Sequence, residues 1–283
     1  RSRSLHLLFC TVCMIVVDGA VREDIPAMDR GFAYGDGVFR TFRVCDGKPQ
    51  HWTRHYAKLE HDCAALALPC ADPAVLLQEV MAASEDGDCA IKIIITRGAA
   101  QRGYAYSEDT PAMRVIIGTP WQAYPPAYRE SGIKTRSCRL RLAHQPALAG
   151  VKHLNRLENV LARAEWNDPD ITEGILCDSE GNVICGTMTN IFFAQGAALV
   201  TPRLDRCGVA GVTRDRILEA AAHLHYSCEI RNIGWAEAQA ADEIFLVNSL
   251  AGVWPVHELD GKIRTVGPVT RALQNALARE DGA

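Results

Sequence analysis

A single lysine, Lys152, opens the segment of this chain that is best suited to covalent chemistry. The segment covers residues 150–163 and reads Gly-Val-Lys-His-Leu-Asn-Arg-Leu-Glu-Asn-Val-Leu-Ala-Arg. Its apolar residues recur at steps of three and four, which predicts a helix with one packed face. These residues are Leu154, Leu157, Val160 and Leu161. A lysine held at the entry to such a helix loses hydration, and burial lowers the pKa of an amine until it can form a Schiff base.

A glycine-rich segment precedes a predicted strand near the start of the chain. Residues 29–41 read Asp-Arg-Gly-Phe-Ala-Tyr-Gly-Asp-Gly-Val-Phe-Arg-Thr, with three glycines within seven positions. Glycine lets a backbone turn tightly and approach another group closely. The segment therefore predicts either a loop that lies against a ligand or an ordinary turn.

An arginine and a tyrosine follow a predicted buried strand at residues 90–96. Arg102 offers a planar guanidinium that matches a carboxylate, and Tyr104 adds a hydroxyl group. The alternative is a solvated arginine on a surface loop.

Two later segments carry groups that suit a phosphate. Residues 208–214 read Gly-Val-Ala-Gly-Val-Thr-Arg and open a predicted helix, whose free amide groups could bind an anion beside the Thr213 hydroxyl. Asn248 and Ser249 directly follow a predicted buried strand, which is a common place for binding residues. Helix capping and turn formation are the alternatives.

Composition narrows the classes of protein that fit. The chain has 283 residues, a net charge of −4 and no apolar run near the length of about 20 residues that spans a bilayer. We therefore expect no nucleic-acid partner and no membrane insertion. The eleven cysteines are irregularly spaced, and only Cys10 and Cys13 form a C-x-x-C pair. This pattern favours reduced thiols in a cytoplasmic protein.

Helices and strands are predicted to interleave without a regular βαβ rhythm, which favours an α+β fold. Expected strands cover residues 14–17, 38–44, 90–96, 113–118, 174–178, 182–185, 190–193 and 242–247. Expected helices cover 54–68, 211–224 and 268–278, and another opens at Asp72 and Pro73. A proline-rich linker at 121–129 separates a small domain, 14–120, from a larger one, 130–283.

The first 13 residues are predicted to be an extension outside the fold. They read basic and then apolar, which resembles a secretory signal, but no small-residue cleavage site follows. Met14 is therefore the expected functional start, with a signal peptide as the alternative.

Together and in this order, these segments resemble the fold-type-IV pyridoxal-phosphate (PLP) enzymes, which are also known as class-IV aminotransferases. That group includes branched-chain aminotransferases, D-amino-acid aminotransferases and 4-amino-4-deoxychorismate lyases. The resemblance covers Met14 to the C-terminus, and the motifs at 29–39, 151–159 and 248–256 are most similar to the lyases. It implies two α/β domains with the cofactor between them, and a homodimer.

The resemblance also implies roles for individual residues. Lys152 matches the lysine that binds PLP and moves protons. Phosphate positions are matched by Lys58, where the family usually has arginine, by Val212 and Thr213 and by Ser249. Substrate positions are matched by Arg102, Tyr104, Asn248, Thr41 and Tyr34.

One departure from the family pattern is serious. A glutamate normally stands five residues before the asparagine of the Asn-Ile-Phe motif and keeps the pyridine nitrogen protonated, but here Cys185 occupies that place before Asn190. A neutral thiol is a poor partner for a pyridinium, so the ring should be a weaker electron sink.

The resemblance implies a lyase that converts 4-amino-4-deoxychorismate to 4-aminobenzoate and pyruvate for folate synthesis. Aromatisation drives this elimination, so it tolerates a weaker electron sink better than transamination does. The alternatives are a D-amino-acid or branched-chain aminotransferase, and a degenerate homologue that binds PLP without turnover.

Overall fold

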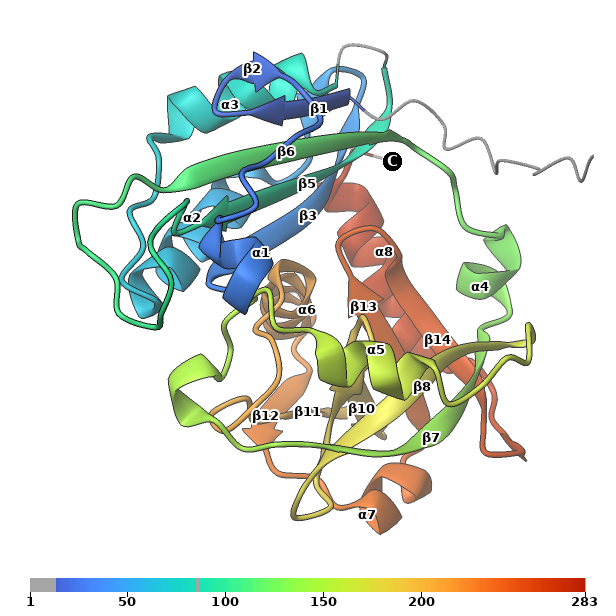
Figure 1. Ribbon diagram of the computed structural model, residues 1–283. Helices are drawn as coiled ribbons and strands as arrows, with labels where there is room; N and C mark the ends of the chain where they lie inside the picture. Colours follow the sequence, from blue (N-terminus) through green and yellow to red (C-terminus); the bar gives the residue numbers. More distant parts are fainter. Residues whose placement is uncertain (1–13, 85–86, 283) are drawn as a thin grey trace, which may run out of the picture.

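Two β-sheets organise the chain, as Figure 1 shows in its upper and lower halves. The computed structural model describes residues 14–84 and 87–282. The predicted extension at 1–13, with Cys10 and Cys13, lies outside the described residues. The upper sheet is built from residues 14–120 and the lower one from residues 133–263.

The upper sheet is antiparallel and has the strand order β2-β1-β6-β5-β3-β4. Its strands are β1 (Met14–Val17), β2 (Ala20–Val21), β3 (Gly37–Cys45), β4 (Lys48–Pro49), β5 (Cys89–Thr96) and β6 (Met113–Pro120). The predicted hairpin turns are confirmed, because Asp18-Gly19 and Asp46-Gly47 both adopt positive φ angles. A short helix, α1 (Arg30–Tyr34), precedes β3.

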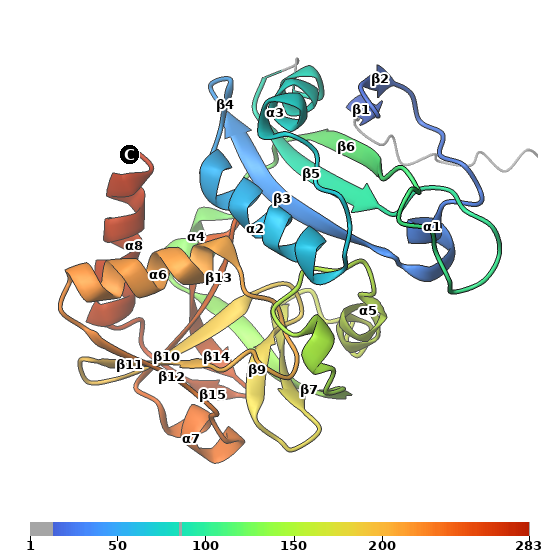
Figure 2. The same ribbon diagram turned by 90° about the vertical axis from the view of Figure 1, so that its left-hand side faces the viewer.

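Two helices cover one face of the upper sheet, as Figure 2 shows. They are α2 (Trp52–Ala65) and α3 (Pro73–Ala82). Helix α3 starts where the sequence predicts, because the Asp72 side chain accepts a hydrogen bond from Ala74 N at 2.7 Å. Alternate residues of β3, among them Val38 and Phe42, point into the core beneath these helices.

The lower sheet is mixed and has the strand order β12-β11-β10-β13-β14-β7-β8-β9, with β15 beside β14. Its strands are β7 (Ile133–Leu142), β8 (Ile171–Asp178), β9 (Val183–Gly186), β10 (Asn190–Gln195), β11 (Ala198–Pro202), β12 (Ser227–Arg231), β13 (Glu243–Asn248), β14 (Gly252–Leu259) and β15 (Lys262–Ile263). The helices of this half are α4 (Pro126–Glu130), α5 (Leu157–Arg163), α6 (Val212–His223), α7 (Trp235–Ala240) and α8 (Pro268–Glu280), with a 3-10 turn at Pro146–Leu148. This arrangement of helices and strands is the predicted α+β fold.

The segment between the sheets is more ordered than the predicted linker at 121–129. It contains the start of α4, and the rings of Tyr124 and Tyr128 pack edge-on against Trp254 of β14. The division of the chain into domains at 121–129 stays a prediction, since the segment is itself packed against the lower sheet.

The helix expected from residue 150 begins later, and its packing was predicted wrongly. Helix α5 starts at Leu157, so Lys152 lies on an extended segment five residues earlier. Of the expected packed face, Leu157, Val160 and Leu161 are exposed. The helical spacing was therefore correct for α5, but its apolar face is not covered by this chain.

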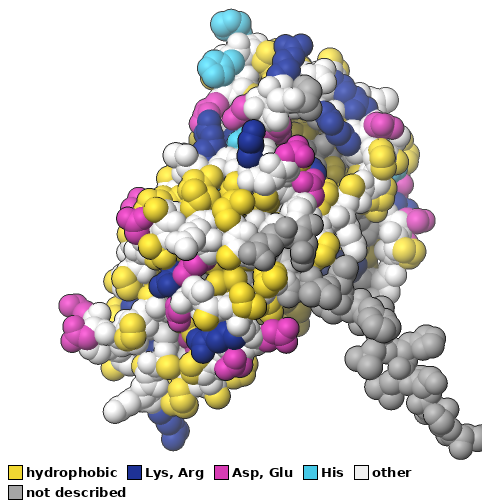
Figure 3. All heavy atoms as spheres, turned by 90° about the horizontal axis from the view of Figure 1, so that it is seen from above, with side chains coloured by type: hydrophobic (Ala, Val, Ile, Leu, Met, Phe, Trp, Pro, Cys, Tyr) yellow, Lys and Arg dark blue, Asp and Glu magenta, His cyan; other side chains and the backbone are white. Residues whose placement is uncertain are grey.

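Charges are mixed on the face seen in Figure 3, which views the molecule from above Figure 1. Lysine, arginine and acidic side chains alternate there, which fits the small net charge of −4. Among the described residues, no helix is both long and apolar enough to cross a membrane.

Candidate active site

The backbone around Lys152 is tied to both halves of the molecule. Phe39 N of β3 donates to Lys152 O at 2.9 Å, and Leu154 N donates to Gly37 O at 2.9 Å. On the other side, Gly150 exchanges hydrogen bonds with the loop before α6, at Gly208 O (3.0 Å) and Ala210 N (2.9 Å). The lysine is therefore fixed between the upper sheet and α6, where the resemblance places the cofactor.

Glycine is required where β3 meets the lysine segment. A Cβ on Gly37 would lie 2.5 Å from Ile95 O and 2.8 Å from Leu154 Cδ1. Gly35 ends α1 with a φ of 68° and leaves room for the Asn155 side chain. The glycine-rich segment thus approaches another part of the chain closely, as its composition predicts.

The amine of Lys152 is well placed to be neutral. Its Nζ lies 4.4 Å from the centre of the Phe39 ring. Burial, together with the positive charges of Arg40 and Arg156, lowers the pKa of Lys152 from 10.5 to about 7. A neutral amine can attack an aldehyde and can accept a proton, which are the two tasks of a PLP-binding lysine.

The start of α6 has backbone donors that suit an anion. Its N-cap, Gly211, offers no side-chain hydrogen bond, so the first amide groups keep their donor capacity. Asn190 Nδ2 donates to Val209 O at 2.8 Å and fixes the loop that presents these amides. The amides of Val212 and Thr213, which the resemblance assigns to phosphate, lie at this helix start.

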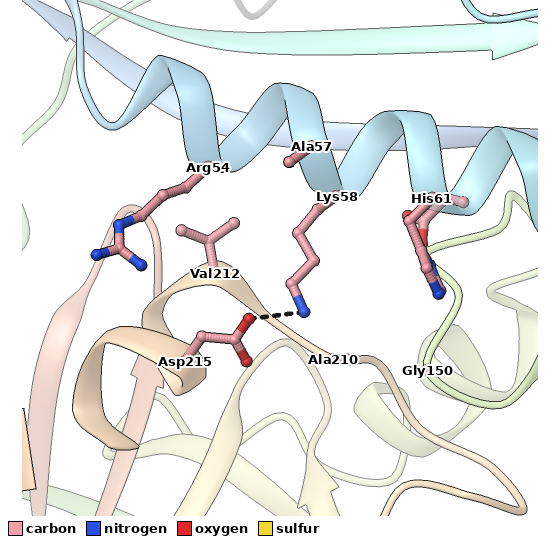
Figure 4. A pocket seen from close by; sticks show the side chains of 9 residues that line it. Arg54, Ala57, Lys58, His61, Gly150, Ala210, Val212 and Asp215 are labelled. Atoms are coloured by element: carbon pink, nitrogen blue, oxygen red, sulfur yellow. Dashed lines mark ion pairs between the residues drawn. The ribbon is translucent and has the colours of Figure 1, made fainter. Parts of the chain in front are cut away.

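A cavity of about 440 Å³ adjoins this helix start (Figure 4). It is lined by Arg54, Ala57, Lys58, His61, Asp62, Gly150, Ala210, Val212 and Asp215. Figure 4 shows Lys58 projecting from α2 towards α6, where its Nζ lies 2.7 Å from Asp215 Oδ2. The cation and the helix amides together fit a phosphate group, so the donor set suits PLP at this end.

Cys185 lies in an apolar cluster with Trp166, Ile184 and Cys207, and is 7% exposed. Burial raises the pKa of its thiol, which therefore stays neutral. A neutral thiol cannot supply the negative charge that a pyridinium needs. The residues that the resemblance assigns to the phosphate fit PLP, whereas Cys185 does not fit the task of the family glutamate.

Glu173 is a buried carboxylate that sequence reasoning missed. It accepts hydrogen bonds from the backbone N–H groups of Thr187 (3.0 Å) and Met188 (3.1 Å) and from the Thr189 hydroxyl (3.2 Å). Its 0% exposure and these contacts show that it shapes the turn after β9. Both carboxylate oxygens are engaged there, so Glu173 is not a substitute for the missing glutamate.

Asn248 stabilises the turn that follows β13. Its Oδ1 accepts from Leu250 N (2.9 Å) and Ala251 N (2.7 Å), and its Nδ2 donates to Met188 O (3.3 Å). Turn formation, the alternative considered for this residue, is thus its observed role. Its contact with substrate and the phosphate contact of the half-buried Ser249 stay predictions.

The loop with Arg102 and Tyr104 is anchored beside α1. Arg30 donates to Gly103 O (2.8 Å) and Tyr104 O (3.0 Å), while the Tyr34 hydroxyl accepts from Gly103 N (3.2 Å). The ring of Tyr104 is 85% exposed and lies 5.4 Å from that of Tyr34. The structure therefore groups Tyr34 with Tyr104, at the surface.

Lys92 is a second residue that sequence reasoning missed. It is paired in register with Thr41 across β5 and β3, and its Nζ lies 5.0 Å from the Phe39 ring that also contacts Lys152. Burial lowers the pKa of Lys92. Its position within an isoleucine-rich strand gave no signal of function, although a charged residue in such a strand is itself unusual.

Comparison with known proteins identifies the family. Residues 37–259 match the class IV amino-transferase family, and the chain belongs to it. The aminodeoxychorismate lyase of Vibrio harveyi is 35% identical over 93% of this chain and 99% of its own length. A putative branched-chain-amino-acid aminotransferase of Methanocaldococcus jannaschii is 28% identical, with 88% of each chain covered.

A solved structure gives the same result. The crystal structure of 4-amino-4-deoxychorismate lyase from Pseudomonas aeruginosa superposes with a TM-score of 0.90 at 44% identity. The match covers 94% of this chain and 99% of that one. The predicted family and fold are confirmed, and the chain is an enzyme of the PLP-dependent class-IV type.

Proposed function

We propose that this protein converts 4-amino-4-deoxychorismate to 4-aminobenzoate and pyruvate. The observation that carries the proposal is the partly buried Lys152, fixed between β3 and the loop before α6 in a chain that is 44% identical to a lyase of known structure. The atoms balance without water, because the enolpyruvyl group leaves as pyruvate and the ring becomes aromatic. The product would serve folate synthesis.

The cofactor of the proposed reaction is pyridoxal 5′-phosphate. When bound, it supplies an aldehyde for the substrate amine and a ring that withdraws electrons. Lys152 would bind it covalently, while Lys58, the amides of Val212 and Thr213, and Ser249 would hold its phosphate. Cys185, a neutral thiol at the position of the family glutamate, would offer the cofactor ring no acidic partner.

The substrate has two carboxylates, which call for cations near Lys152. Lys92 of β5 would bind one of them, since its Nζ and that of Lys152 both lie over the Phe39 ring. The exposed Arg102, on the loop beside α1, would bind the other. Tyr104, Tyr34 and Thr41 would add hydroxyl contacts, and Asn248 would orient the substrate from the turn after β13. These assignments are proposals for single-residue tests.

Lys152 would move the protons of the reaction. Its neutral amine takes a proton from the ring carbon that carries the substrate nitrogen, and the C–O bond to the enolpyruvyl group breaks. The departing enol then takes up a proton from Lys152 or from solvent and becomes pyruvate. A pKa of about 7 allows the amine both to accept a proton and to donate one near neutral pH.

We also propose a homodimer, supported by a strip of exposed apolar side chains. Phe32 of α1 is 72% exposed and Leu157 of α5 is 67% exposed. The end of α1 lies close to the start of α5, because Asn155 Nδ2, just before α5, donates to O of Gly35, the C-cap of α1, at 3.3 Å. The strip consists of Phe32, Tyr104, Leu157, Val160, Leu161 and Met188. An apolar surface of this kind is typical of a protein interface.

The nine cysteines in the described part of the chain are all free thiols. Free thiols persist in a reducing compartment, and we propose that the protein works in the cytoplasm.

The function is tested with enzymatically generated 4-amino-4-deoxychorismate, purified protein and PLP. We expect 4-aminobenzoate fluorescence from the wild type and none from Lys152→Ala. Lys262→Ala is the matched control, since this lysine is exposed on β15 and should leave the rate unchanged. Product from Lys152→Ala at the wild-type rate would refute the assigned role of the lysine.

A further inference from the structure

A buried ion pair contacts the backbone of Lys152. Arg40 points from β3 into the core face of the upper sheet and is 2% exposed, and it pairs with Asp62 of α2, which is 0% exposed. Arg40 also donates to Lys58 O at 3.2 Å. The neighbouring core-facing residues of the same strand, Val38 and Phe42, are apolar, so a charge at this position is an exception to the pattern of the strand.

Stability alone does not explain this pair. Among the described residues, Arg40 Nε and Asp62 Oδ1 have no hydrogen-bond partner. Burying two charges carries a desolvation penalty that such incomplete bonding does not recover, and apolar residues often serve equally well in such a place. The arrangement therefore calls for a second role.

The pair is linked to the reactive lysine by geometry. Asp62 Oδ2, the oxygen that meets Arg40, also accepts a hydrogen bond from Lys152 N at 3.2 Å. One carboxylate oxygen thus joins α2, β3 and the lysine segment. Asp62 also lines the cavity at the start of α6, so the same residue contacts the lysine backbone and the proposed phosphate site.

Several other charged or titratable groups surround the lysine. They are His55 of α2, Lys92 of β5 and Arg156 of its own segment. Burial and the charge of Arg40 lower the pKa of His55 to about 3, so this ring is neutral. For the amine of Lys152, Arg40 is the strongest of the charges and Asp62 acts in the opposite direction.

We propose that Arg40 and Asp62 are a positioning pair for Lys152. Asp62 holds the lysine backbone between the two halves of the molecule, and Arg40 places a fixed positive charge that favours the neutral amine. The proposal rests on the proposed use of Lys152 as the reactive amine. It predicts that the pKa of Lys152 shifts in opposite directions when Arg40 and Asp62 are neutralised one at a time.

The test measures the pKa of Lys152 directly in the full chain freed of cofactor. Trace labelling with acetic anhydride over a series of pH values, read by mass spectrometry, gives the pKa of each lysine. Arg40→Met should raise the pKa of Lys152 by about one pH unit, whereas Asp62→Asn, which keeps an acceptor for Lys152 N, should lower it. Arg40→Lys retains the charge and should keep the wild-type pKa.

Arg114→Met is the matched control. Arg114 belongs to the same half of the molecule and forms an ion pair with Glu79 at 2.8 Å. It is not a partner of Lys152, Arg40 or Asp62. This variant should leave the pKa of Lys152 unchanged. Circular dichroism checks the folding of every variant.

Shifts of the same sign in Arg40→Met and Asp62→Asn, or no shift in either, would overturn the proposal, because opposite charges that act on the amine must shift its pKa in opposite directions. If Arg40→Met does not fold, the pKa of Lys152 is measured instead in the double variant Arg40→Met/Asp62→Asn, which has neither charge. A pKa of Lys152 above the wild-type value supports the proposal, and an unchanged pKa refutes it.

Reaction of the wild type with PLP, followed by borohydride reduction, locates the modified lysine separately. Modification of a lysine other than Lys152 would refute the proposed function. The pKa of Lys152 in the variants would still test whether Arg40 and Asp62 act on its amine.

Discussion

At the scale of single residues, burial of Lys152 should make stability depend on pH. Its pKa is about 7 in the folded protein and 10.5 when exposed, so between these values the unfolded chain binds a proton that the folded chain lacks. Stability contributed by this group therefore rises with pH from about 7 to about 10.5, and the penalty is greatest below pH 7.

Replacing Lys152 with methionine removes this penalty. In the cofactor-free protein at pH 6, Lys152→Met should raise the free energy of unfolding by ~2–4 kcal/mol, and the gain should shrink above pH 10. Urea denaturation at both pH values measures it. An equal gain at the two pH values would show that the amine is not desolvated.

Cys185 stands where the resemblance implies a glutamate beside the cofactor ring. Cys185→Glu should raise turnover by about tenfold, which corresponds to ~1.4 kcal/mol of transition-state stabilisation, because a carboxylate would favour the protonated ring. The larger side chain should also destabilise the apolar cluster by about 1–3 kcal/mol. Steady-state kinetics and thermal unfolding measure the two effects, and Cys207→Ser in the same cluster is the control. Unchanged or slower turnover would show that Cys185 does not impair the cofactor.

The residues that could be predicted from the sequence are those that lie within a recognisable motif. Lys152 and Thr213 stand in segments whose spacing and glycines have a physical meaning on their own. Arg40, Asp62 and Lys92 lie in ordinary strand and helix patterns. Their importance comes from being close in space to Lys152, which lies 60 to 112 positions further along the chain. A local sequence pattern cannot show that residues so far apart in the chain lie close together in space.

At the scale of elements, the turn after β9 depends on Glu173. Glu173→Gln replaces an acceptor oxygen with an NH₂ group that faces the N–H donors of Thr187 or Met188. We expect a loss of about 2 kcal/mol in unfolding free energy and a weaker hold on Asn248, which bonds Met188 O. Thermal unfolding checks the loss, with Glu180→Gln on the exposed β8–β9 turn as control. Equal stability of the two variants would contradict this role.

Element prediction succeeded where apolar periodicity and turn residues agreed. Strand β5, with its isoleucines, and helix α3, with its Asp-Pro start, are examples. Strand β7 was not predicted, because four of its ten residues are lysine or arginine and its place is fixed by parallel pairing with β8 and β14. Helix α5 was predicted with a packed face, because periodicity shows which residues share a face but not what covers it.

At the scale of the whole molecule, we expect the exposed apolar strip around α1 and α5 to be covered by a second copy of the chain in a dimer. Leu157→Glu/Leu161→Glu places charges in the strip and should convert the protein to monomers. Light scattering after size exclusion measures the mass, and Leu224→Glu, an exposed leucine at the end of α6, is the control. A monomeric wild type would contradict the proposed dimer.

The central claim is that this chain is a lyase and not an aminotransferase. The most direct measurement gives the protein 4-amino-4-deoxychorismate with no 2-oxo acid present and quantifies both products. The account predicts 4-aminobenzoate and pyruvate in equal amounts over many turnovers, with no dependence on an added 2-oxo acid. No 4-aminobenzoate, together with amino-group transfer that starts when a 2-oxo acid is added, would contradict it.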